Sequence, residues 1–263
     1  MLNMKKMQKV ELNYKHSGQV AEIILNDGKG NVLDCIMMQE LNQLFGDFKK
    51  NPDIKIITFE GAGKHFSFGA SVEEHTKDQV VEMLNNFHSL FYNIVDMSIP
   101  TLAKISGQCL GGGLELALIC NFMFADNTAK LGQPEIILGV FPPPASILLP
   151  LKIGAARAEE LLITGNTIDA STAEESGLLN YVFEDKDNLN AETENWIQEH
   201  ILPKSASSLR YSVRSGRIVL NRVFKKNLKK LEKIFIKELM ETDDANEGIN
   251  SFMEKRIPVW KNS

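Results

Sequence analysis

The sequence predicts an α/β fold, and three observations lead to this prediction. In the first half of the chain, short runs rich in β-branched residues alternate with longer segments of helical spacing. Three consecutive glycines at residues 111–113 stand between a strand-like run and a helix-like run. After Leu151 the spacing is almost entirely helical. Because no clear linker or repeat divides the chain, we expect one domain with a helical C-terminal region.

The first expected elements form a βαβ unit. Residues 20–25 and 54–60 are apolar runs bounded by turn formers, and each predicts a strand. Between them, Asp34 occupies the N-cap position of a segment in which apolar residues recur at helical spacing as far as Phe48. Strand, helix and strand in this order are typical of a βαβ unit.

The rest of the chain predicts further alternation, followed by helices. A long helix is expected over residues 72–97, ending before Pro100, because the residue preceding a proline is pushed out of the helical region. Around the three glycines, we expect strands at residues 101–106 and 122–125, a helix at 114–120 and a loop-rich stretch at 132–144. The last third predicts helices over residues 153–164, 189–201, 205–220, 222–241 and 245–256, with one short strand at 179–183.

Composition and charge exclude disordered and fibrous proteins. Of the 263 residues, 43% are hydrophobic and 24% are charged, and the net charge is -5. This is the profile of a globular protein. A negatively charged molecule does not attract polyanions, so nucleic acid is not expected as a partner. An anionic ligand would instead be held by backbone N–H groups, helix N-termini or a few placed cations.

The cysteines and the apolar segments indicate a cytoplasmic protein. Cys35, Cys109 and Cys120 are odd in number and lack metal-binding spacing, which favours a reduced compartment. No apolar segment follows the lysines of residues 1–11, so we expect no export signal. The longest nearly apolar stretch, residues 116–125, is shorter than the ~18 residues that a membrane span needs. We therefore expect no membrane partner.

Two glutamates and the glycine turn are the candidate chemical groups. The glycines let the backbone approach a ligand closely and leave N–H groups unpaired at the start of a helix. Glu115 follows them inside an apolar stretch, where burial would raise its pKa. Glu135 is also flanked by apolar residues, so the two could act as an acid and a base if the chain folds back. A tight turn with two merely structural carboxylates remains the alternative interpretation.

The loop at residues 65–71 is a further candidate. Its small residues could supply a second backbone N–H to the same ligand atom. His65 is interpreted as a loop histidine, because no serine or cysteine nucleophile pairs with it at a recognisable spacing.

Taken together, these segments resemble the crotonase, or enoyl-CoA hydratase and isomerase, superfamily over nearly the whole chain. The resemblance rests on GQCLGGGLELA at residues 107–117, LGQPE at 131–135, FSFGA at 66–70 and the closing segment 243–256. It implies a crotonase-like spiral of ββα turns over residues 1–200 and a helical region over residues 201–263, in one continuous domain. It also implies assembly as a trimer or hexamer and an acyl-CoA thioester as substrate.

The resemblance also implies roles for individual residues. The backbone N–H groups of Ala70 and Gly112 would form an oxyanion hole for the thioester carbonyl. Glu115 would activate the attacking water, and Glu135 would deliver or share the proton. Because both glutamates are present, addition or elimination of water is favoured over isomerisation. The implied contacts to the acyl group and CoA are Asn31, Leu33, Phe66, Phe68, Ala70, Ser71, Gly111, Gly112, Pro142, Phe252 and Lys255.

Two segments depart from the usual hydratase pattern. Residues 140–146 read VFPPPAS where a glycine-rich loop is usual, and Ser71 replaces the usual Asp before VEEH at residues 72–75. We expect the three prolines to stiffen the wall near the acyl group and to remove N–H donors. Both segments resemble the cyclohexa-1,5-diene-1-carbonyl-CoA hydratases of anaerobic aromatic (benzoyl-CoA) degradation, whose product is 6-hydroxycyclohex-1-ene-1-carbonyl-CoA. No metal or cofactor is implied beyond the CoA of the substrate.

Other functions remain open at this point. The same scaffold supports a general short-chain enoyl-CoA hydratase, an enoyl-CoA isomerase or a carbon–carbon bond hydrolase. A non-catalytic RNA-binding member of the superfamily is the alternative from another class. It would use the basic face formed by Lys225, Lys229, Lys233 and Lys237, although a solvated face over an apolar stripe is the simpler interpretation.

Overall fold

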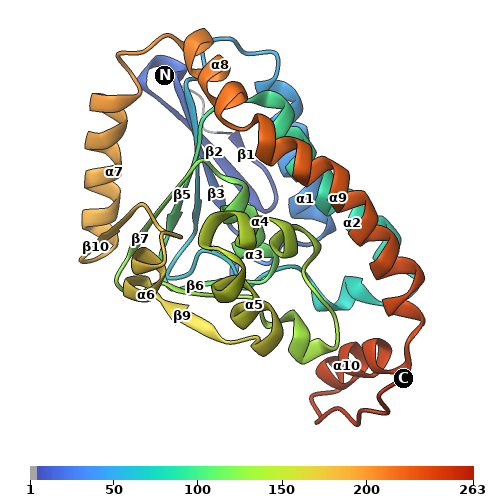
Figure 1. The fold of residues 1–263 in the computed structure, drawn as a ribbon. Coiled ribbons are helices and arrows are strands. Elements are labelled where there is room, and N and C mark those ends of the chain that lie inside the picture. The colour runs from blue at the N-terminus through green and yellow to red at the C-terminus, as the bar shows by residue number, and fades with distance from the viewer. Residues whose placement is uncertain (1–4) are drawn as a thin grey trace.

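The computed structural model describes residues 5–263, and a seven-stranded sheet lies at its centre (Figure 1). The strands follow the order β1-β2-β3-β4-β5-β7-β10. Strands β1 to β3 pair antiparallel, whereas β3, β4, β5, β7 and β10 pair parallel. Parallel strands are covered on both faces, which is why the central ones are mainly apolar. Glu22, Glu60 and Lys104 are charged exceptions within β3, β4 and β5. Their bounds are β1 Lys5–Lys6, β2 Val10–Lys15, β3 Val20–Leu25, β4 Ile56–Gly61, β5 Thr101–Ile105, β7 Phe122–Asp126 and β10 Tyr181–Phe183.

Helices cover both faces of this sheet. On one face, α1 (Cys35–Phe48) packs against α2 (Val80–Met97). On the other face lies α7 (Lys186–His200), at the left of Figure 1. Leu189 and Ile197 of α7 are buried against the sheet. The sheet is therefore the middle layer of the fold.

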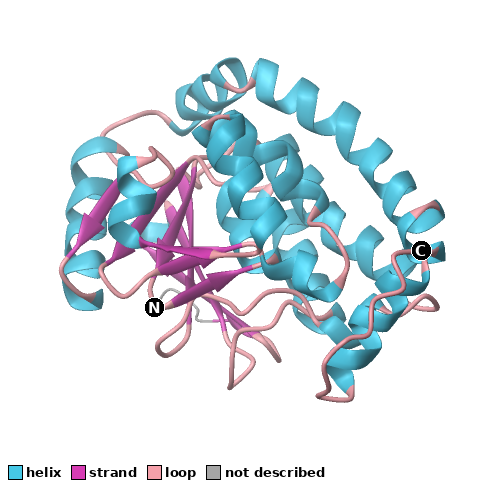
Figure 2. Cartoon of the chain, turned by 60° about the horizontal axis from the view of Figure 1, so that its bottom comes forward, coloured by secondary structure: helices cyan, strands magenta, loops and turns pink. Residues whose placement is uncertain are grey.

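A second, smaller sheet leads the chain into the buried helix α3 (Gly112–Ile119), and the chain leaves α3 through β7 of the large sheet. The smaller sheet consists of β6 (Gln108–Leu110), β8 (Lys130–Gly132) and β9 (Thr167–Asp169). Figure 2 shows the strands gathered at the left of the view, with most of the helices to their right. The remaining helices are α4 Pro143–Ile153, α5 Ala155–Thr164, α6 Ala170–Glu175, α8 Ala206–Gly216, α9 Ile218–Lys237 and α10 Asp243–Met253. Short 3-10 turns span His16–Gly18, Val72–His75, Pro134–Leu138 and Leu239–Glu241.

The βαβ prediction is confirmed. Strands β3 and β4 are parallel, and α1 joins them. The Asp34 carboxylate caps α1 by accepting a hydrogen bond of 3.0 Å from the Met37 N–H. Strands β1, β2, β6, β8 and β9 were not predicted. Four of them, β1, β6, β8 and β9, have only two or three residues and depend on their partners more than on their own composition.

Two element predictions are wrong in part. The expected helix over residues 72–97 is a 3-10 turn at Val72–His75 followed by α2 from Val80, because Thr76 leaves the helical conformation with ψ 150°. The expected loop over residues 132–144 contains a 3-10 turn and the start of α4 at Pro143. Proline is tolerated in the first turn of a helix, where its missing N–H would have no partner.

The C-terminal segment folds back along α10. Arg256 forms an ion pair with Glu247, and the Lys261 and Asn262 N–H groups donate to Asp244 at 2.7 Å each. α10 itself packs against the 3-10 turns Val72–His75 and Pro134–Leu138. No helix among residues 5–263 is both long enough and apolar enough to cross a membrane. The division at residues 200 and 201 and the cytoplasmic location stay predictions.

Candidate active site

The glycine turn before α3 brings two chain segments into direct contact. Gly111 has φ +49°, and Gly112 opens α3. A Cβ atom on Gly112 would lie 3.0 Å from the Ala70 nitrogen, so a larger residue would push the two backbones apart. Glycine at this position therefore allows the Ala70 and Gly112 backbones to lie side by side.

A network of hydrogen bonds holds the Ala70 loop in place. The Leu33 N–H donates to the Gly69 carbonyl at 2.9 Å, and the Ser71 N–H donates to the Leu33 carbonyl at 3.2 Å. The buried Ser67 hydroxyl accepts from the Gly69 N–H at 3.1 Å. Among the described residues, no acceptor pairs with the N–H of Ala70 or of Gly112. Two neighbouring main-chain donors are thus left available to a ligand.

Glu115 lies in the first turn of α3 and is only 3% exposed. Its Oε1 accepts a hydrogen bond of 2.9 Å from the Ala145 N–H, in the first turn of α4. The two residues before Ala145 are Pro143 and Pro144, which have no N–H. The prolines therefore leave Ala145 as the first donor of α4, and that donor binds Glu115.

Glu135 approaches the same place from the 3-10 turn Pro134–Leu138. A Cβ atom on Gly111 would lie 2.8 Å from Oε1 of Glu135, so this carboxylate lies directly against the glycine backbone. The buried Gln133 amide nitrogen, oriented toward the carboxylate, lies 3.0 Å from both Oε1 and Oε2. Gln133 therefore positions the Glu135 side chain.

Both carboxyl groups have raised pKa values. Burial is the largest cause for Glu115, and the charge of Glu135 adds to it, while the Ala145 N–H acts in the opposite direction. Burial also raises the pKa of Glu135. Two interacting carboxyl groups titrate as a pair, and raised pKa values allow the pair to keep one proton near neutral pH.

The two glutamates and the two free N–H groups line one cavity of about 270 Å³. Its walls are otherwise mainly apolar, and they include Val72, Met83, Leu84, Phe87, Phe141 and Phe235. Phe68 and Phe252 also line it and are 46% and 56% exposed. A cavity with apolar walls and a few convergent polar groups is the usual form of a small-molecule site.

The cavity brings together eight of the residues named from the sequence. These are Phe68, Ala70, Gly111, Gly112, Glu115, Glu135, Pro142 and Phe252. The other five, Asn31, Leu33, Phe66, Ser71 and Lys255, do not line it. Leu33 and Phe66 are buried in the core, whereas Lys255 is exposed. Contacts from these five residues to CoA stay predictions.

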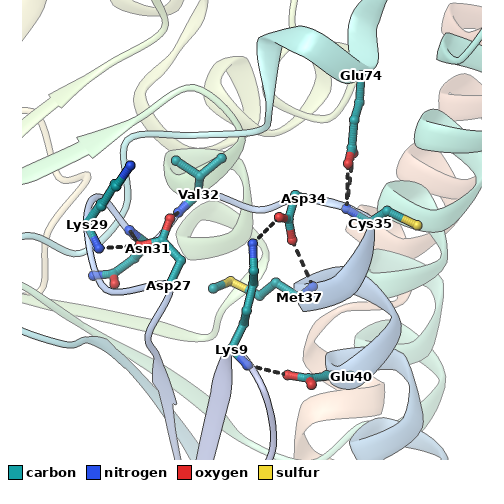
Figure 3. Close-up of polar contacts among 10 residues, drawn as sticks. All are labelled: Lys9, Asp27, Lys29, Asn31, Val32, Asp34, Cys35, Met37, Glu40 and Glu74. Carbon is teal, nitrogen blue, oxygen red and sulfur yellow. Dashed lines mark hydrogen bonds and ion pairs between the residues drawn. The ribbon is translucent and has the colours of Figure 1, made fainter.

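Asn31 and His65 hold the loops beside the cavity. The buried Asn31 amide donates to the carbonyl groups of Ala62, His65 and Phe66, at 3.1, 2.8 and 3.2 Å. The Asn31 N–H in turn donates to Asp27, as Figure 3 shows. His65 Nδ1 accepts from the Gln108 N–H at 3.1 Å, so His65 contributes to the structure of its loop.

Sequence reasoning missed two polar residues of the site. Gln133 was read only as part of a motif, although its position two residues before Glu135 was a usable signal. His75 lines the cavity from the 3-10 turn Val72–His75. It was placed in the first turn of a long helix, which gave no reason to expect it in the cavity.

Comparison with known proteins identifies the family. The Enoyl-CoA hydratase/isomerase family matches residues 15–263, so the chain belongs to this family. It is an enzyme, an acyl-CoA hydratase of the carbon–oxygen lyase class. The predicted family and fold class are thereby confirmed.

Particular relatives differ in how similar they are. The cyclohexa-1,5-dienecarbonyl-CoA hydratase of Thauera aromatica is 41% identical, over 94% of this chain and 95% of that protein. A probable enoyl-CoA hydratase of Mycobacterium bovis is 34% identical, over 88% of this chain and 89% of that protein.

Solved structures support the fold. An enoyl-CoA hydratase from Bacillus anthracis has a TM-score of 0.76 and 29% identity, covering 97% of this chain and 100% of that one. An enoyl-CoA hydratase from Mycobacterium avium subsp. paratuberculosis has a TM-score of 0.85 at 21% identity, covering 96% of this chain and 98% of that one. At this identity the second comparison supports the fold alone.

Proposed function

We propose that the enzyme adds water to cyclohexa-1,5-diene-1-carbonyl-CoA and forms 6-hydroxycyclohex-1-ene-1-carbonyl-CoA. The observation that carries the proposal is the pair Glu115 and Glu135, which share an apolar cavity with two free backbone N–H groups. The similarity to the Thauera aromatica hydratase supports the cyclic substrate. This reaction would place the enzyme in anaerobic degradation of aromatic compounds.

The size of the cavity suits a ring. A cavity of about 150 Å³ is enough to hold a benzene molecule. The cavity here measures about 270 Å³, which accommodates a six-membered ring together with a water molecule. The apolar walls favour the ring over a charged group.

In the proposed mechanism the Ala70 and Gly112 N–H groups donate to the thioester oxygen. Negative charge develops on that oxygen as the enolate forms, and each donor is worth ~2.7 to 4 kcal/mol of barrier in comparable sites. The polarised thioester makes ring carbon 2, the β-carbon, electrophilic. Glu115 takes a proton from water, and the resulting hydroxide bonds to this carbon.

The second proton transfer completes the addition. The dienolate is protonated on ring carbon 5, at the remote end of the diene, and Glu135 supplies this proton. The remaining double bond then lies between ring carbons 1 and 6, so one molecule of water has been added. The two carboxyl groups have exchanged roles, and solvent restores their starting protonation.

We further propose that CoA enters only as part of the substrate and that no other cofactor takes part. The chain's own groups provide both proton transfers and the stabilisation of the enolate charge. Assembly as a trimer or hexamer, and the lack of a nucleic-acid partner, stay predictions.

A general short-chain enoyl-CoA hydratase is the second candidate function. It is favoured by the similarity to the probable enoyl-CoA hydratase of Mycobacterium bovis. Its substrates would use the same carboxylates and N–H groups, so the geometry of the catalytic groups does not separate the two functions. The two functions differ in the acyl group that the cavity must hold.

A direct assay tests the proposal. The purified enzyme is given cyclohexa-1,5-diene-1-carbonyl-CoA and crotonyl-CoA side by side, and products are followed by absorbance and mass spectrometry, with Glu115→Gln as the control. A gain of one water on the diene, with little on crotonyl-CoA, is the expected result. Preference for crotonyl-CoA would instead establish the general hydratase, and inactivity on both would contradict both candidates.

A further inference from the structure

His75 is the third titratable side chain that lines the substrate cavity, and the proposed mechanism does not use it. It closes the 3-10 turn Val72–His75 and is half-buried. The neighbouring cavity walls at Val72, Met83 and Leu84 are apolar. A polar ring in such surroundings marks the place where a ligand or a water would find a hydrogen-bond partner.

The turn that carries His75 is held from two sides. Glu74, the preceding residue, accepts hydrogen bonds from the Cys35 N–H at 3.0 and 3.1 Å, at the start of α1 (Figure 3). In Figure 3 the Glu74 side chain reaches down from its own turn to this helix end. His75 Nδ1 lies 2.7 Å from the Ser71 carbonyl oxygen. The ring therefore has a fixed position.

The contact with Ser71 determines which ring nitrogen carries the proton. A carbonyl oxygen only accepts, so Nδ1 must donate, and the Nε2 of a neutral ring is left as an acceptor. Burial lowers the pKa of His75, which favours the neutral ring. The Ser71 carbonyl opposes this effect.

Within residues 5–263, the Nε2 atom of His75 has no hydrogen-bond partner. Four side-chain atoms of the described residues are both buried and without a hydrogen-bond partner, and His75 Nε2 is not one of them. Those atoms are His88 Nε2, Tyr92 Oη, Thr193 Oγ1 and Asn221 Oδ1. His75 Nε2 is therefore accessible, and the His75 side chain lines the cavity that contains Glu115 and Glu135.

We propose that His75 is a specificity-determining residue, whose Nε2 accepts a hydrogen bond from the hydroxyl group of a hydroxylated alicyclic acyl-CoA. This inference rests on the proposed function, because the hydroxyl is the group that hydration places on the ring. In the dehydration direction the same contact selects the ring alcohol over a ring without a hydroxyl. A plain hydrocarbon acyl chain leaves Nε2 without a partner.

Two substitutions separate the two nitrogens of the ring. In His75→Asn the amide nitrogen takes the place of Nδ1 and keeps the bond to the Ser71 carbonyl, but no atom replaces Nε2. In His75→Gln the amide reaches the position of Nε2, where its oxygen is an acceptor. The first variant removes the proposed contact, and the second restores it.

The test measures binding in the Glu115→Gln background, so that neither ligand is turned over. Isothermal titration gives the Kd of cyclohexanecarbonyl-CoA and of 2-hydroxycyclohexanecarbonyl-CoA for His75 and for both variants. With His75, we expect the hydroxyl to improve binding by about threefold to tenfold. The improvement should vanish in His75→Asn and largely return in His75→Gln.

The outcomes also distinguish this inference from the proposed function. An equal improvement with His75 and in His75→Asn would overturn the role of His75, even if the wild-type enzyme hydrates the diene. No effect of the hydroxyl in any variant would overturn it as well. Failure of the wild-type enzyme to hydrate the diene would overturn the proposed function, whatever the binding ratios are.

Discussion

Two groups of carboxylates that are buried or half-buried in this enzyme have opposite surroundings. Glu22 and Glu60 lie beneath α7, where the Lys104 ammonium contacts Glu22 at 3.0 Å and Glu60 at 2.6 Å. Glu115 and Glu135 lie in the cavity, where among the described residues neither forms an ion pair. Burial is therefore common to both groups, and a compensating charge is present in only one.

The pKa values follow this difference. Burial alone would raise the pKa of Glu22, but Lys104 and Lys15 outweigh it and lower the pKa. No cation opposes burial at Glu115, and its pKa rises. The comparison teaches that an uncompensated carboxylate, rather than a buried one, marks the place where protons can be exchanged at neutral pH.

The largest expected effect separates the two groups by activity. Glu115→Gln and Glu135→Gln each remove one of the proposed proton-transfer groups, so kcat should fall by about 10³-fold. Steady-state hydration of the preferred acyl-CoA measures this loss. Glu22→Gln is the matched control, because it changes a buried carboxylate outside the cavity and should leave kcat nearly unchanged. A comparable loss in Glu22→Gln would remove the distinction between the two groups.

The second prediction concerns the ion-paired group. Lys104→Met leaves Glu22 and Glu60 buried without their shared cation, and the free energy of unfolding should fall by about 3 to 5 kcal/mol. Urea unfolding measures this change. Lys15→Met is the control, because Lys15 also contacts Glu22 but its side chain is 45% exposed. Lys15→Met should lower the free energy of unfolding by no more than about 1 kcal/mol. An equal loss in Lys15→Met and Lys104→Met would contradict the role given to the buried ion pair.

The third prediction concerns the stability of the folded enzyme, which should change in opposite directions when Glu115 and Glu22 are each replaced by glutamine. A carboxyl group whose pKa is raised by folding binds more protons in the folded state, so its contribution to stability falls as the pH rises above the unfolded pKa of 4.5. Glu115→Gln removes this loss and should stabilise the enzyme at pH 8 by on the order of 1 kcal/mol. Thermal unfolding at pH 5 and pH 8 should show the gain growing with pH.

Glu22 should behave in the opposite way in the same experiment. Its lowered pKa contributes stability that is present above the unfolded pKa and is lost as the pH falls through the folded pKa. Glu22→Gln should therefore destabilise the enzyme at pH 8, and the destabilisation should shrink toward acidic pH. The same pH dependence in both variants would show that the two environments do not differ as described.

The smallest expected effect concerns Gln133. Its amide donates to both oxygens of Glu135, which favours the ionised form of that carboxyl group. Gln133→Met removes these donors at similar side-chain length and should raise the pKa of Glu135, the proton donor of the proposed mechanism. The basic limb of the kcat/KM profile should therefore move to higher pH by about half a unit to one unit. Gln133→Glu would place a further negative charge beside Glu135, so it does not serve as a matched control. An unmoved basic limb would show that Gln133 acts only in packing.

Much of the fold could be predicted from local pattern. The strand at residues 20–25 and the Asp34 cap depend on residues that are neighbours in sequence, and the structure confirms both. The start of α4 could not be predicted this way, since residues 143–149 are apolar except for Ser146 and show no helical period. Its place becomes clear only when the Ala145 N–H is seen to bind Glu115, thirty residues away.

The candidate site was predicted unevenly for the same reason. Glu115 and Glu135 stood out because each interrupts an apolar stretch. His75 and Gln133 did not, since their importance depends on what the folded chain places beside them. The side chains of Asn31 and Leu33 face the interior instead of the cavity, because the buried Asn31 amide holds neighbouring loop carbonyls.

The two unpaired donors, the N–H groups of Ala70 and Gly112, belong to the main chain. A point mutation exchanges side chains, so no substitution except one to proline deletes either donor outright. Genetic variation can therefore reshape the cavity walls at Pro142, His75 or Phe252 while the two main-chain donors are inherited intact. Directed evolution toward new acyl groups should accordingly begin with libraries at these wall positions.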